Sequence, residues 1–186
     1  MKNSSSIVSR SFLAIAFVTL FAAGAGGCAL SVEADVPDVE VTQHGIAVVG
    51  VPTAISGGND MSTNLSFTQS LPDLNLPADL GSTVKAVKVD LVAKSGVDNF
   101  DFLKSLRITM TPAGSTVPTE LINYQKADGA TVGNKLSIDS LNPVNILDQW
   151  KANKAVFNIE VEGKLPSQTW TMDMSVHFAG QVSYKY

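Results

Sequence analysis

Cysteine is nearly absent from this sequence of 186 residues, which contains only Cys28. No disulfide can form within the chain, and the domain that follows Cys28 has no thiolate for a metal site or a nucleophile. Histidine is also scarce. Only His44 and His177 are present, which limits zinc sites and histidine-assisted nucleophiles. The 158 residues that follow Cys28 are enough to bury a stabilising core without such cross-links.

Charge is sparse and mainly acidic, with 16% charged residues and 13 basic against 17 acidic side chains. Two of the basic residues, Lys2 and Arg10, lie in a segment that we expect to be removed. An acidic surface repels the phosphate backbone and anionic lipid headgroups alike. The composition therefore argues against nucleic acid as a partner and against membrane attachment through a basic patch.

The main apolar run covers residues 12–23 and is too short to cross a bilayer as a helix, which takes roughly 18 to 20 residues. The polar segment Met1–Arg10 with its two cations precedes it, and the small residues 24–27 follow it. This three-part layout is typical of a secretory signal. We therefore predict that residues 1–27 are a cleaved signal peptide and exclude them from the fold.

The residues around the cysteine sharpen this prediction. Ala25-Gly26-Gly27-Cys28 resembles the lipobox of bacterial lipoproteins. The resemblance implies that Cys28 receives a diacylglyceryl group with fatty acids such as palmitate, and becomes the first residue of the mature chain. Two or three acyl chains make such attachment stable, whereas one is marginal. Ala29, in place of Asp, favours the outer membrane in the enterobacterial sorting pattern. The alternative is an ordinary secretory signal that contains a cysteine.

Beyond the signal, alternation of apolar and polar residues predicts antiparallel strands with one buried and one wet face. The clearest case is the closing segment, where Trp170, Met174 and Val176 share one parity while Asp173 and His177 share the other. Strands are predicted within residues 39–49, 65–71, 87–91, 106–110, 121–125, 135–139, 155–161 and 170–186.

The segments between these strands carry turn residues, as in Gly57-Gly58-Asn59-Asp60, Pro112-Ala113-Gly114, Asp128-Gly129 and Leu165-Pro166. Short helices are predicted only at Val97–Lys104 and Val144–Trp150. The fold class is therefore all-β, an antiparallel β-sandwich of about eight strands. Residues 28–38 are predicted as the lipidated N-terminus and a tether, and residues 39–186 as a single domain.

One motif suggests cell-wall chemistry. Ser82-Thr83-Val84-Lys85 matches the Ser-x-x-Lys pattern of penicillin-binding proteins, and Lys94-Ser95-Gly96 resembles their third box. The order argues against the match, because a Ser-x-Asn box should lie between the two, whereas Ser62-Thr63-Asn64 precedes both and no Ser-x-Asn lies between Lys85 and Lys94. We expect Ser82 in a turn and Lys85 on the exposed face of a strand.

Other candidate sites are weak. Asp98, Asn99 and Asp101 cluster oxygen ligands that suit calcium, but their spacing is not that of an EF-hand, and a capped turn toward Lys104 is the simpler interpretation. We expect His177 to be solvated and His44 to be a core or edge residue, beside Gly45 where a bulge could change the strand parity. No metal and no cofactor are predicted.

The two tryptophans are candidates for a ligand surface. The parity of Trp170 predicts burial, while Trp150 at the end of a predicted helix is left open.

Three classes of function follow. The first is a non-catalytic envelope lipoprotein that binds a protein partner or serves a structural role. The second is a carrier or sensor of an apolar ligand between the sheets. The third is a hydrolase using carboxylates such as Asp98, Asp101, Glu160 or Glu162, which would require two of them to converge with raised pKa values.

Overall fold

The computed structural model describes residues 31–72, 81–140 and 144–185. The predicted signal peptide and Cys28 lie outside these residues. Eight strands and two short helices make up the described chain. Their bounds are β1 Ser31–Val48, α1 Thr53–Ser56, β2 Met61–Ser70, β3 Thr83–Ser95, β4 Leu103–Pro112, β5 Thr119–Gln125, β6 Lys135–Asp139, α2 Leu147–Trp150, β7 Lys154–Gly163 and β8 Trp170–Lys185.

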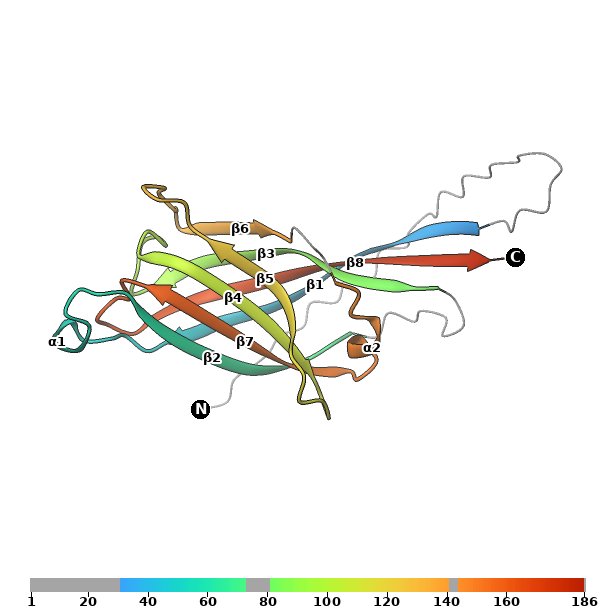
Figure 1. Cartoon of the computed structure of the whole chain (residues 1–186), viewed down its shortest axis with the longest axis horizontal. Helices are drawn as coiled ribbons and strands as arrows, with labels where there is room; N and C mark the ends of the chain where they lie inside the picture. Colours follow the sequence, from blue (N-terminus) through green and yellow to red (C-terminus); the bar gives the residue numbers. More distant parts are fainter. Residues whose placement is uncertain (1–30, 73–80, 141–143, 186) are drawn as a thin grey trace.

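The strands form two four-stranded antiparallel sheets (Figure 1). Sheet A has the order β1-β8-β3-β6, and sheet B has the order β2-β7-β4-β5. Successive strands thus alternate between the sheets for most of the chain, which is the arrangement of an eight-stranded jelly roll. The predicted all-β sandwich of about eight strands is confirmed.

The core lies between the sheets and follows the predicted parities. On β8, Met174 is 2% exposed and Val176 is fully buried, while Asp173 and His177 point to the opposite, polar face. On β7, Phe157, Ile159 and Val161 are buried in the same alternating way. Side chains of one parity therefore build the core, and those of the other parity are left to form the outer surfaces.

The predicted tether at residues 31–38 is wrong, because this segment is the first half of β1 and pairs with the end of β8 from Ser31↔Lys185 onward. The register shifts between Val36 and Val39, where Pro37 and Asp38 interrupt the pairing. Such a bulge moves the apolar residues from even positions before it to odd positions after it. The apolar residues of β1 therefore do not follow one continuous alternation across the bulge, and a search for such an alternation does not recognise this segment as a strand.

The predicted helix at Val97–Lys104 is also wrong. Residues 96–102 form bends and a turn, and β4 begins at Leu103. Phe100 is 1% exposed, its N–H faces the carbonyls of Val132 and Gly133, and its ring meets that of Trp170 at 6.2 Å. These tertiary contacts override a weak local preference for helix.

The second predicted helix, Val144–Trp150, is present only as its last turn, α2. The side-chain oxygen of Asn145 accepts hydrogen bonds from the N–H groups of Leu147 and Val84, and so fixes the start of α2 against β3. Helix α1 follows Pro52 and was not predicted. Among the described residues, no helix is both long and apolar enough to cross a membrane.

Candidate functional site

The outer face of sheet A carries the densest group of interacting polar side chains that we find in the described chain. We call this group the sheet A face. Its members come from four neighbouring strands and point away from the core because the alternate residues of each strand are buried. They are Glu40, Thr42 and His44 of β1, Asp173, Ser175 and His177 of β8, Lys88, Asp90 and Lys94 of β3, and Lys135 and Ser137 of β6.

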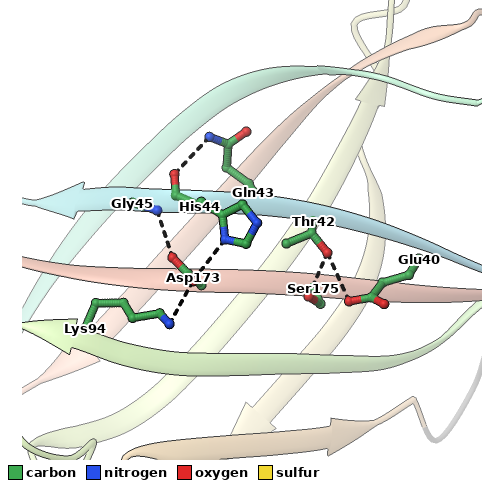
Figure 2. Close-up of polar contacts among 8 residues, drawn as sticks. All are labelled: Glu40, Thr42, Gln43, His44, Gly45, Lys94, Asp173 and Ser175. Carbon is green, nitrogen blue, oxygen red and sulfur yellow. Dashed lines mark hydrogen bonds and ion pairs between the residues drawn. The ribbon is translucent and has the colours of Figure 1, made fainter. Parts of the chain in front are cut away.

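Asp173 is the centre of one half of this face (Figure 2). Its Oδ2 lies 3.0 Å from Nδ1 of His44 and 3.1 Å from Nζ of Lys94, and its Oδ1 accepts a 2.9 Å hydrogen bond from the N–H of Gly45. Burial alone would raise the pKa of Asp173, but these three partners outweigh it and lower the pKa below its ordinary value. The carboxylate is therefore held in its charged form.

The geometry at Asp173 depends on a bulge in β1. The register with β8 shifts between Gln43 and Ile46, and Gly45 adopts a positive φ of 63° that favours glycine. The predicted change of parity at Gly45 is thereby confirmed. His44 is an edge residue with a side chain 65% exposed, and the possibility that it belongs to the core is excluded.

Beside this centre, hydroxyl groups join β1 to β8. Thr42 Oγ1 donates to Glu40 Oε1 at 3.0 Å and lies 2.9 Å from Ser175 Oγ (Figure 2). The pKa of Glu40 is lowered below its ordinary value, mainly by a hydrogen bond with the side chain of Ser175. These short polar contacts link edge strand β1 to its neighbour on the solvent side.

Asp90 is the centre of the other half. It forms ion pairs with Lys88 at 3.3 Å and Lys135 at 3.5 Å, and it accepts a hydrogen bond from Ser137. Burial alone would raise its pKa, but the hydrogen bonds from Ser137 and Lys88 outweigh burial and lower the pKa. Both acidic centres of the sheet A face are thus surrounded by cations and donors.

His177 is less solvated than predicted. It lies on the polar side of β8 as expected, but its side chain is only 25% exposed and its Nε2 is 3.4 Å from Asp90 Oδ2. That distance allows an ion pair when the imidazole is protonated, although the contact lacks hydrogen-bond geometry. His177 therefore packs against Asp90 and is not a freely hydrated side chain.

The His44–Asp173 pair shares one contact with a catalytic triad, in which a carboxylate orients Nδ1 of a histidine. A triad also needs a nucleophile at the other ring nitrogen, and within the described ranges no hydroxyl is paired with Nε2 of His44. The lowered pKa values of Asp173 and Asp90 are the opposite of what a general acid requires. The arrangement suits cohesion and binding better than proton transfer.

The carboxylates proposed for a hydrolase are not brought together. Glu162 binds Lys104 at 3.0 Å and Ser105 at 3.1 Å, and these contacts lower its pKa. Glu160, on the same strand, lies in register with Asn64 and Arg107. Asp101 accepts a hydrogen bond from the N–H of Val132 in a different loop. These carboxylates do not converge in one cleft, and the pKa of Glu162 is lowered, so the geometry gives the hydrolase alternative no support.

The calcium candidates Asp98, Asn99 and Asp101 form a turn stabilised from within. The side-chain oxygen of Asn99 accepts a 3.0 Å hydrogen bond from the N–H of Asp101, the pattern of an Asx turn. The predicted cap is therefore a cap of a turn and not of a helix. Over residues 31–72, 81–140 and 144–185, no three histidine or acidic side chains gather as metal ligands.

Ser82 and Lys85 do not reproduce a penicillin-binding site. Ser82 is 6% exposed and directly precedes strand β3, where the family requires the start of a helix. Lys85 lies within β3, as expected, and is half-buried. Lys94 of the supposed third box is paired with Asp173.

Both tryptophans belong to the core. Trp170 is 1% exposed, as predicted, and Trp150 is 3% exposed. The Nε1 of Trp150 donates to the carbonyl of Pro72 at 2.8 Å, and its ring meets the edge of Phe178 at 4.7 Å. Neither ring is available as an exposed platform for a sugar.

The best-formed hollows among the described residues open on the surface at loops, and neither of the two lies between the sheets. One of about 450 Å³ is lined by Asp60, Phe102, Lys104, Lys126 and Lys164 among others. The other, of about 350 Å³, lies between the turn Pro112–Ser115 and helix α2. A carrier of an apolar ligand needs a mainly apolar, enclosed lining. These hollows do not provide it.

Sequence reasoning identified the outward parity of Asp173 and His177 but missed their partners on other strands. The pairing of His44 with Asp173 depends on the bulge at Gly45 and on β1 lying next to β8. Parity along one strand contains no information on which strands are neighbours. The glycine beside the histidine was the only local signal.

Comparison with known proteins gives little beyond this geometry. No protein-family model and no curated protein matches the chain. Among solved structures, the decameric BFDV capsid protein is similar at 13% identity and a TM-score of 0.38, covering 78% of this chain and 98% of that one. The infectious bursal disease virus Gx strain structure gives 10% identity and a TM-score of 0.31, covering 82% of this chain and 37% of that one. The structure of tomato aspermy virus gives 14% identity and a TM-score of 0.22, covering 64% of this chain and 76% of that one. These likenesses are too low to support any argument on function.

Proposed function

We propose that this chain is a non-catalytic lipoprotein of the bacterial cell envelope, held to a membrane through lipid on Cys28. The observation that carries the proposal is the layout of residues 1–28, in which a cationic start, a short apolar run and small residues lead into the chain's only cysteine. The alternation of polar and apolar residues after it is typical of a folded β domain that follows the anchor.

The position of β1 supports attachment at one end of the sandwich. Strand β1 begins at Ser31, which pairs with Lys185 near the end of β8. Strand β3 begins to pair with β8 only at Gln181, opposite Thr83, so the first residues of β1 and the last of β8 extend beyond β3 as a two-stranded ribbon. In Figure 1 this two-stranded end projects from the body of the two sheets. Three residue steps separate Cys28 from Ser31, which span at most about 11 Å. A lipid on Cys28 therefore holds the domain close to the membrane by this ribbon.

The sheet A face supports a binding or structural role. Its carboxylates form ion pairs and hydrogen bonds with lysines, histidines and hydroxyl groups. These contacts stabilise the sheet and do not suit proton transfer to a substrate. A face of mixed charges with paired centres suits contact with another envelope protein, where complementary charges give specificity. We therefore propose a protein partner in the envelope and no nucleic-acid partner.

The anchoring is tested by Cys28→Ala in a bacterial host supplied with a labelled fatty acid. The variant is expected to lose the label and to leave the membrane fraction, while the matched variant Ala29→Ser keeps both. Retention of the Cys28→Ala chain in membranes after a high-salt wash would show that the lipid reading is wrong.

The choice of membrane is tested separately. In an enterobacterial host, the unaltered chain is expected in the outer membrane, and Ala29→Asp is expected to redirect it to the inner membrane. Equal distributions of the two chains on a density gradient would contradict the outer-membrane proposal. Crosslinking in the native membrane, followed by identification of the captured protein, tests the proposed partner.

A further inference from the structure

The two sheets leave four edge strands, and within the described residues one of them, β2, carries in its own sequence and pairing none of the usual features that prevent pairing with another chain. Edge strands in natural proteins carry charges, prolines or bulges, or are very short, because their free backbone groups can pair with a further strand. The edges here are β1 and β6 in sheet A and β2 and β5 in sheet B.

Three of these edges show the protective features. Strand β1 has two register shifts and includes Pro37 and several acidic residues. Strand β6 has five residues and carries Lys135 and Asp139. Strand β5 contains Glu120 and has a register shift against β4. Each of them therefore resists the addition of another strand.

Strand β2 has none of them. Its sequence Met-Ser-Thr-Asn-Leu-Ser-Phe-Thr-Gln-Ser contains no charge, no proline and no glycine. Its ten residues pair with β7 without a register shift, from Met61↔Gly163 to Ser70↔Lys154. The side chains of its inner parity, among them Leu65 and Phe67, are only half-buried. Phe67 stacks on the fully buried Phe157 at 5.6 Å, so this edge continues the apolar core to the rim of the sheet.

The order of residues in β2 is also symmetric about its middle. If Ser66 is placed opposite itself in an antiparallel pair, Leu65 faces Phe67 and Thr63 faces Gln69 on the inner side. On the outer side, Asn64 then faces Thr68, and Ser62 faces Ser70. From Ser62 to Ser70, apolar residues thus meet apolar ones and polar residues meet polar ones, with no like charges opposed.

We propose that β2 pairs antiparallel with β2 of a second copy of this chain, with Ser66 on the twofold axis. Such an interface is isologous, because each residue contacts the position that contacts it in return. The two copies of sheet B then form one continuous eight-stranded sheet with β2 and its symmetry mate in the centre. Pairing satisfies the free backbone groups of both edges and covers Leu65 and Phe67.

A second copy fits this edge better than an unrelated strand because the symmetry of the strand is internal. A foreign peptide needs no relation between the first and second halves of β2. In a homodimer the two halves must match each other, as Leu65 matches Phe67 and Ser62 matches Ser70. The inference does not depend on the lipid anchor proposed above.

Disulfide formation tests both the partner and the register. In the full chain, Ser66→Cys places two thiols opposite each other, where Cα atoms lie about 4.5–5.5 Å apart, within reach of a disulfide. Ser62→Cys is the matched control, since it is also an exposed serine of β2. Its two copies lie eight positions apart along the pair, about 26 Å. In a Cys28→Ser background, which leaves no other thiol, and with mild oxidant, Ser66→Cys is expected to give a reducible homodimer that Ser62→Cys and the background chain do not give.

A second pair of variants measures the assembly without a disulfide. The purified, unaltered full chain is expected to have twice the monomer mass by light scattering. Ser66→Lys sets the two introduced charges opposite each other and is expected to shift the chain to monomer mass, whereas Ser62→Lys leaves the dimer intact. The proposal is overturned if the unaltered chain is monomeric, if Ser66→Cys crosslinks no better than Ser62→Cys, or if it is joined to a different protein.

Discussion

Replacing Met174 by alanine is the sharpest test of which face of β8 is buried. Met174 is 2% exposed and lies in register with Gln43 of β1 and Leu91 of β3, so its side chain enters the core at the middle of sheet A. Met174→Ala removes three buried heavy atoms, which at about 0.8 kcal/mol each is about 2.4 kcal/mol of transfer free energy. The cavity left behind adds to this, so we expect a loss of about 3 kcal/mol, within the range of about 2–5 kcal/mol for such changes.

Urea unfolding of the purified chain without its lipid measures this loss. With a denaturant slope of about 2 kcal/mol/M, the midpoint for Met174→Ala is expected to fall by about 1.5 M. His177→Ala is the control on the opposite face; because its side chain is 25% exposed and packs against Asp90, we expect a loss of about 1 kcal/mol, well below that of Met174→Ala. Its contact with Asp90 lacks hydrogen-bond geometry, and Asp90 keeps Lys88 and other partners. A neutral Met174→Ala with a strongly destabilising His177→Ala would refute the assigned faces.

Three further predictions follow from glycine, charge and motif. A Cβ at Gly163 would lie 2.1 Å from the carbonyl oxygen of Phe102, so Gly163→Ala is expected to lower the free energy of unfolding by about 3 kcal/mol or more. Gly129 has open space around it, so Gly129→Ala is expected to cost only about 1 kcal/mol for its positive φ. Thermal melts compare the two variants, and similar losses would contradict the close approach at Gly163. Because the folded pKa of Asp173 is lowered, its charge stabilises the fold above the ordinary pKa of about 3.9, and this stabilisation is lost as the pH falls through the lower folded value. The difference in urea midpoint between the unaltered chain and Asp173→Asn should therefore be present at pH 7 and vanish in strong acid; a constant difference would refute the linkage. Penicillin is expected to leave the mass of the chain unchanged, and stoichiometric acylation of Ser82 would overturn our rejection of the Ser-x-x-Lys match.

The sequence predicts the strands well where one face of a strand is buried along its whole length. In β8 the apolar residues alternate from Trp170 to Phe178, and each of them is buried. The same holds for β7, where the pattern from Ala155 to Val161 matches the burial of the strand. Alternation of this length is determined by the core itself, so no knowledge of neighbouring strands is needed.

The predictions failed where the backbone or a distant contact determines the local structure. The tether at residues 31–38 is a strand because its backbone pairs with β8, and the bulge at Pro37 hides its alternation. The helix at Val97–Lys104 is replaced by a turn because Phe100 and Phe102 pack on Trp170. Both determinants join segments far apart in the sequence, which a periodicity within one segment cannot reveal.

The sheet A face was only partly predictable for a similar reason. The polar parity of Asp173 was read correctly, but Lys94 and His44 reach it from strands on either side of β8. Only the strand order β1-β8-β3 brings them together. Site residues that belong to different strands thus become visible only once the topology is known.

The identity of the mature N-terminus tests the central claim most directly. Mass spectrometry of the chain isolated from bacterial membranes is expected to find residues 1–27 absent and an N-terminal peptide that starts at Cys28 and carries the mass of a diacylglyceryl group with its fatty acids. A mature chain that starts at another residue, or that carries Cys28 as an unmodified thiol, would contradict the claim that this protein is a lipoprotein.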